Sequence, residues 1–144
     1  MNLRDEAKRR LAEYRWRSRA VERLPEEIRR LEIKAQKLGS APTDREPVQG
    51  GGSTQEEGVL ENLEARELLG ELLRDNLSLV ESVEETMKVL PEEEQEILRA
   101  LVIEPDDGGA ERLCETMGVQ KSRLYRRLDE SMDHFTVAMF GWEK

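Results

Sequence analysis

The chain has 144 residues, of which 38% are charged and only 4% aromatic, so it favours long helices that share a narrow apolar seam over a large compact core. Its formal net charge of −9 at pH 7 argues against strong non-specific binding of nucleic acid by the chain as a whole. A single cysteine and a single histidine exclude an internal disulfide and a Cys/His metal site, and we expect no metal and no cofactor.

The charge is unevenly distributed along the chain. Residues 1–38 hold 12 basic and 7 acidic side chains, residues 39–108 hold 5 and 19, and residues 109–144 hold 6 and 6. Because the acidic side chains lie in the middle, the two ends of the chain remain able to approach DNA. No stretch approaches the length of a membrane span, and the basic N-terminus precedes no apolar run, so we expect a soluble protein without membrane contact.

The first predicted helix covers residues 3–38. Its apolar residues recur at alternating steps of four and three, with a slip of one residue between Val21 and Ile28. Pro25 lies at this slip, so the helix is predicted to kink there or to stop and restart. We expect its arginines to pair with the acidic second helix; a second surface for nucleic acid or a partner is the alternative.

A second long helix is predicted after a glycine-rich connection. Residues 39–58 contain two prolines and a Gly-Gly-Gly-Ser run, which predict a flexible loop without chemistry. The seam of four-three spacing then continues without a slip to Leu90, so residues 1–90 are predicted to form a long antiparallel helical hairpin. Asn76 falls in this seam, where it either fixes register or oligomeric state or is simply tolerated.

Residues 91–144 are predicted to form a separate helix-turn-helix domain, which makes the fold class all-α. Pro91 opens a helix with an acidic first turn, and Pro105 with the following glycine pair ends it. Gly118 then separates a short helix ending at Met117 from a longer one that begins near Gln120. The longer helix is predicted to continue to Gly141, with a final stripe of Met and Phe residues packed against the rest of the protein.

The start of this last helix carries the candidate DNA contacts. Gln120 and Arg123 have side chains that suit adenine and guanine edges, while the other polar residues suit phosphates, and Leu124 is predicted to point inward. The alternative is a solvated charged face on an ordinary pair of helices. The full candidate set is Gln120, Lys121, Ser122, Arg123, Tyr125, Arg126 and Arg127.

The segment from Leu90 to Gly141 resembles region 4 of bacterial sigma factors. More closely, it resembles the C-terminal domain of phage-encoded transcriptional regulators of the RinA and ArpU type, which control late packaging and lysis genes. The resemblance rests on the apolar residues of the first helices, on the run SRLYRR at residues 122–127 and on the closing FTVAMFG at residues 135–141. Arg127 departs from the pattern, because an apolar residue often stands there.

The resemblance implies a regulator of phage or prophage late genes that acts in the cytoplasm of a bacterial host cell. Its expected partners are double-stranded DNA, RNA polymerase, and a second copy of the chain bound through the N-terminal helices. Two other interpretations stay open: a helical module that docks on polymerase or another protein without specific DNA binding, and a DNA-packaging subunit like a small terminase. We expect no enzymatic activity, because Cys114 and His134 lie far apart in sequence and the carboxylates fall on charged helix faces.

Overall fold

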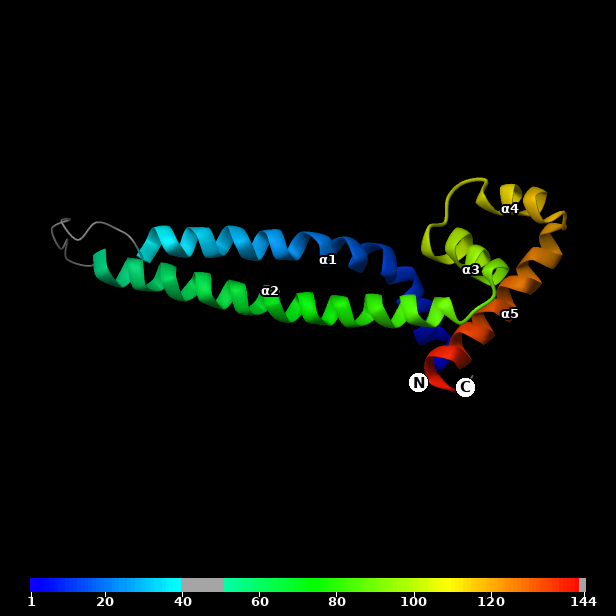
Figure 1. The fold of residues 1–144 in the computed structure, drawn as a ribbon, viewed down its shortest axis with the longest axis horizontal. Helices are drawn as coiled ribbons and strands as arrows, with labels where there is room; N and C mark the ends of the chain where they lie inside the picture. The colour runs from blue at the N-terminus through cyan, green and yellow to red at the C-terminus, as the bar shows by residue number, and fades with distance from the viewer. Residues whose placement is uncertain (40–50, 143–144) are drawn as a thin grey trace. The chain divides into compact units, whose positions relative to one another are not determined.

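The structure, a computed structural model, describes residues 1–39 and 51–142, and within these ranges it contains helices and no strand. The prediction of an all-α fold is therefore confirmed. None of the helices in these ranges is long and apolar enough to cross a membrane. In chain order they are α1 (Leu3–Gly39), α2 (Gly51–Lys88), α3 (Glu92–Leu98), the π-helical turn η1 (Arg99–Ile103), α4 (Gly109–Met117) and α5 (Lys121–Phe140), drawn in Figure 1.

The contacts divide the chain into two compact units. The C-terminal unit comprises Met1–Ser18 together with Ser78–Lys144, and the two-helix unit comprises Arg19–Leu77. The expected division at residue 90 therefore differs from the grouping of contacts. The start of α1 and the end of α2 belong with α3, α4 and α5, because their apolar residues share one core.

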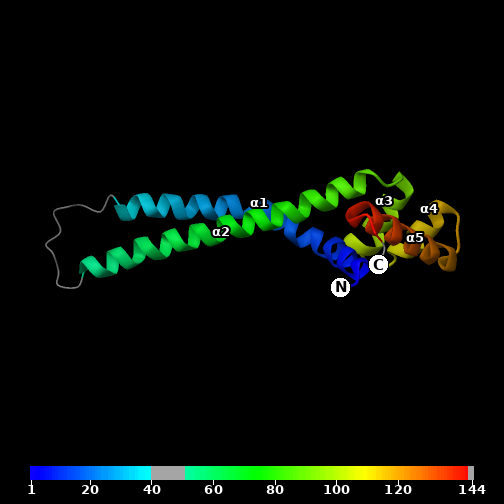
Figure 2. The ribbon, with the colours of Figure 1, turned by 90° about the horizontal axis from the view of Figure 1, so that it is seen from below.

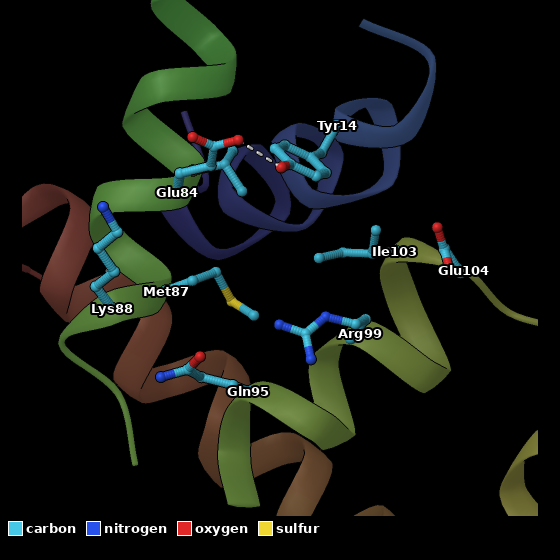
Figure 3. A pocket seen from close by; sticks show the side chains of 9 residues that line it. Tyr14, Glu84, Met87, Lys88, Gln95, Arg99, Ile103 and Glu104 are labelled. Atoms are coloured by element: carbon cyan, nitrogen blue, oxygen red, sulfur yellow. Dashed lines mark hydrogen bonds between the residues drawn. The ribbon is translucent and has the colours of Figure 1, made fainter. Parts of the chain in front are cut away.

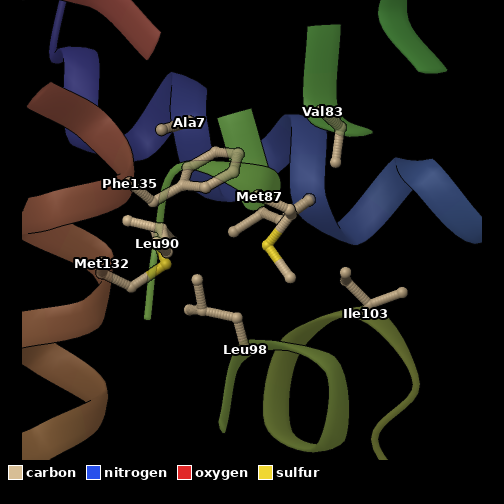
Figure 4. Close-up of a cluster of buried hydrophobic side chains, with 9 residues drawn as sticks. Ala7, Val83, Met87, Leu90, Leu98, Ile103, Met132 and Phe135 are labelled. Atoms are coloured by element: carbon tan, nitrogen blue, oxygen red, sulfur yellow. The ribbon is translucent and has the colours of Figure 1, made fainter. Parts of the chain in front are cut away.

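The core of the C-terminal unit forms around Phe135 of α5, whose side chain is fully buried. Leu11 of α1 and Leu98 of α3 are fully buried in the same cluster, so the N-terminal helix shares one core with α3 and α5. Figure 4 shows side chains from α1, α2, α3 and α5 turned toward one another. The stripe predicted on the last helix thus packs inside the protein. The buried core cluster is Ala7, Leu11, Val83, Met87, Leu90, Leu98, Ile103, Met132 and Phe135.

Within the two-helix unit, α1 and α2 lie side by side in both Figure 1 and Figure 2. The Asn62 Nδ2 atom donates a hydrogen bond of 2.9 Å to the Leu31 carbonyl, and Gln55 Nε2 donates one of 3.0 Å to the Leu38 carbonyl. The two helices therefore run antiparallel here. Asn62 is 6% exposed and reaches across to α1, whereas Asn76 bonds the Leu72 carbonyl of its own helix.

Two helix boundaries differ from the predictions. α1 continues through Pro25 as one helix, so of the two predicted alternatives, a kink or a stop with a restart, the stop is wrong. Pro25 is exposed and removes only its own N–H, so water can satisfy the Val21 carbonyl that loses a partner. α2 begins at Gly51, so the prediction of a loop through residue 58 is wrong; tertiary contact at Gln55 overrides the poor helix propensity of the glycines. The remaining loop residues, 40–50, lie outside the described residues.

Most ion pairs of α1 lie within the helix itself. Arg9 and Arg10 both pair with Glu6, and their hydrogen bonds lower the pKa of that carboxyl from 4.5 to about 2. Arg17 likewise pairs with Glu13 of the same helix. For these three arginines the expected pairing with acidic residues of α2 is therefore wrong, because carboxylates three or four residues away on α1 are nearer.

Candidate nucleic-acid interface

Gly118 makes the tight turn between α4 and α5. Its φ of +67° lies in the left-handed region, and its N–H donates to the Cys114 carbonyl. The Val119 N–H donates to the same carbonyl at 3.1 Å. A Cβ added at Gly118 would meet no atom within 4 Å, so the turn requires glycine for its backbone conformation and not for space.

Gln120 begins α5 in an extended conformation, as the N-terminal cap. Its carbonyl accepts hydrogen bonds from the N–H groups of Arg123 (3.1 Å) and Leu124 (3.0 Å), which starts the helix. Leu124 is fully buried and fixes the rotation of α5 about its axis, as predicted. Ser122 and Arg123, which directly precede Leu124, are consequently exposed.

A polar hollow of about 720 Å³ lies along the exposed face of α5. Arg123 and Arg126 line it, and neither forms an ion pair with any residue of the ranges 1–39 and 51–142. Cations without an internal partner keep their full charge available for a ligand. The residues around the hollow are Gly118, Val119, Gln120, Ser122, Arg123, Arg126, Arg127 and Glu130.

Lys121 is exposed but already has a partner. Its Nζ lies 2.5 Å from Glu111 Oε1 of α4, and both side chains are more than half exposed. The hydrogen bond between them raises the pKa of Lys121 and lowers the pKa of Glu111. Tyr125, one helical turn further along, is 48% exposed on this same side of α5 and does not line the hollow.

Arg127 is half-buried and pairs with Glu93 of α3. Its side chain therefore links α5 to α3 by an ion pair. An apolar residue at this position would contribute packing only. Glu130 adds one negative charge to the hollow at its C-terminal end. The structure thus brings four of the seven predicted contacts together without internal ion pairs: Gln120, Ser122, Arg123 and Arg126.

A second hollow, of about 310 Å³, lies within the C-terminal unit (Figure 3). Tyr14 donates a hydrogen bond of 2.7 Å to Glu84 at its rim, and burial with this bond raises the pKa of Tyr14 to about 12. Four charged side chains line it: those of Lys88, Arg99 of the π-helical turn, Glu84 and Glu104. With two side chains of each sign, this hollow has no net preference for an anion.

Three acidic residues near the interface were absent from the sequence-based set. Glu130 follows Arg126 and Arg127 at helical spacing, so the sequence alone carried enough information to place it on the same face. Glu93 and Glu111 lie on other helices, and their proximity depends on tertiary packing.

No cluster of three or more potential metal-ligating side chains occurs among the described residues. No family model, curated protein or solved structure matches the chain.

Proposed function

We propose that the protein binds double-stranded DNA through the N-terminal half of α5 and regulates transcription. In this proposal α4, the Gly118 turn and α5 act as a helix-turn-helix of the sigma region 4 kind, and α1 with α2 acts as a helical hairpin that presents it. The observation that carries the proposal is the pair of exposed arginines on α5, Arg123 and Arg126, which have no internal ion-pair partner in the described part of the chain.

The arrangement of the hollow suits a DNA groove. Gln120 and Arg123 lie at the start of α5, the end of a recognition helix that reaches base edges. An arginine can bond guanine and a glutamine can bond adenine with two hydrogen bonds each. Arg126, one turn further along, suits a phosphate of the backbone. Two internal pairs, Lys121 with Glu111 and Arg127 with Glu93, must open or stay outside the contact.

The genes under control are a separate step of the proposal. The resemblance to RinA- and ArpU-type regulators supports late packaging and lysis genes of a phage or prophage as the target, with the bacterial cytoplasm as the site of action. Fragments that cover the promoters upstream of such genes are therefore the first ones to test.

The proposal is tested by selecting fragments bound by the full chain from a random DNA pool and then measuring their affinity for variants. R123A/R126A should bind the selected fragment more weakly by about 1–3 kcal/mol for the base contact, with a further loss for the phosphate contact. R29A/R74A is the matched control, since it removes two exposed arginines outside α5. If both double variants bind alike, α5 is not the DNA-binding element.

A docking function on polymerase or another protein is the second candidate. The acidic neighbours Glu93, Glu111 and Glu130 favour it, because they offset much of the positive charge of α5. Failure of the selection to enrich any fragment at low salt would favour docking over DNA binding.

A further inference from the structure

The two-helix unit, Arg19–Leu77, has no buried apolar side chain among its described residues. All buried apolar residues of the described chain belong to the C-terminal unit, and the one buried residue of the two-helix unit is the polar Asn62. Leu68 is 56% exposed and Leu72 is 41% exposed. Leucines this open on a long helix indicate a surface that is covered in the functional state.

Leu68 and Leu72 belong to one row on α2. Each directly precedes a residue of the seam with α1, Leu69 or Leu73. Acidic residues extend this acidic-leucine row at the same position relative to the seam. Glu61 directly precedes Asn62 and Asp75 directly precedes Asn76, while Glu71, which precedes no seam residue, flanks the row on the side away from the seam, three residues after Leu68. All three carboxylates are exposed and form no ion pair within the described residues: Glu61, Glu71 and Asp75.

A basic row runs along α1 at the matching position. Arg23, Arg30 and Lys34 directly precede the seam residues Leu24, Leu31 and Ala35, and one acidic residue, Glu27, precedes Ile28 in the same row. In an antiparallel pair of helices, positions just before the seam lie on the same side of the pair. Arg23 and Lys34 form no ion pair within the described residues, and Arg30 pairs only with Glu27 of its own helix.

We propose that this side of the two-helix unit binds the same side of a second copy of the chain. A two-fold axis parallel to the helices then places the basic row of each copy on the acidic-leucine row of the other. The two rows also lie at matching heights along the helix axes. The hydrogen bonds from Asn62 to Leu31 and from Gln55 to Leu38 set the register within the unit, which puts Arg23 level with Gly70 and Arg30 level with Leu63.

The resulting dimer is a four-helix bundle in which every neighbouring pair of helices is antiparallel. Leu68 and Leu72 of both copies lie at its centre, and charges of opposite sign from the two copies flank them. This inference rests on the two-helix unit alone and is independent of DNA binding by α5.

The mass of the full chain in solution gives the first test. Light scattering after size exclusion should give about twice the 16.7 kDa of one chain. L68E/L72E should reduce the mass to that of one chain while helix content stays constant by circular dichroism, since both side chains are exposed in a single copy. V89E is the matched control, because Val89 is 70% exposed outside the row. A single-chain mass for the unaltered protein, or a dimer that survives L68E/L72E, overturns the proposal.

A charge exchange tests which helix meets which. R23E/R30E/K34E puts acidic residues on both facing rows of its own dimer, and E61K/E71K/D75K puts basic residues on both. Each variant alone should therefore be a single chain. Mixed in equal amounts, the two should form a heterodimer, because each altered row then meets a row of opposite charge. A mixture that stays single-chain, or variants that each dimerise alone, would show that α1 does not pack on α2 of the partner.

Discussion

Replacement of Leu11 by alanine tests whether the start of α1 belongs to the C-terminal unit. Leu11 is fully buried, and it lies in one cluster with Phe135 and Leu98. Truncating a buried leucine removes its transfer free energy and leaves a cavity, at a cost of about 2–5 kcal/mol. Small domains are stable by only about 5–15 kcal/mol, so L11A should destabilise the protein severely.

The assay is urea unfolding of the full chain, followed by circular dichroism. L24A is the matched control on the same helix, because Leu24 is half-buried in the two-helix unit and its truncation should cost less, about 1–2 kcal/mol. If the free energy of unfolding of L11A lies within about 1 kcal/mol of that of the unaltered protein, α1 does not pack on α5 as described. Residues 91–144 would then be expected to fold without α1.

Three further results are expected. E111Q should strengthen binding to non-specific DNA, because Lys121 loses its internal partner and becomes available for a phosphate. Measured by fluorescence anisotropy, the slope of log affinity against log salt concentration should steepen by about one unit. The pKa of Tyr14 is raised from 10.0 to about 12, so the folded state holds the phenol proton more tightly; this contribution to stability is present below pH 10 and is lost as the pH rises toward 12. Unfolding measured across that range should show less pH dependence in Y14F, which also loses the hydrogen bond to Glu84. G118A should cost about 1–2 kcal/mol in urea unfolding without changing helix content, because alanine is strained at a φ of +67° while the space around it is open.

Local signals in the sequence placed the helix ends of the C-terminal part well. Gly118 and Gly141 both adopt left-handed conformations directly after a helix, as glycine at such positions predicts. The rotation of α5 also followed from the sequence, because Leu124 was the apolar residue among charged neighbours. These features depend on a few neighbouring residues, which is why the pattern alone determined them.

Features that depend on tertiary packing were predicted less well. The glycines near Gly51 indicated a loop, but contacts made by the helix that follows extend α2 through them. Asn62 follows the same four-three spacing as Asn76, and only the structure distinguishes the asparagine that bonds across the helices from the one that bonds within α2. The grouping of α1 with α5 likewise depends on residues more than a hundred positions apart, which periodicity cannot connect.

The candidate interface shows the same division. The exposed positions of α5 followed from helical spacing, but the pairing of Lys121 with Glu111 and of Arg127 with Glu93 did not. Each of these pairs occupies one cationic side chain of α5. Fewer positive charges are therefore available for DNA than the sequence alone indicated.

The most direct test of DNA binding by α5 is the salt dependence of affinity for a selected fragment, measured for the full chain and for R126A. The affinity of the full chain should fall steeply with added salt, and R126A should lower the slope of log affinity against log salt concentration by about one unit, since one phosphate contact is lost. A salt-independent affinity, or an unchanged slope in R126A, would contradict the assignment of α5 as the DNA-binding helix.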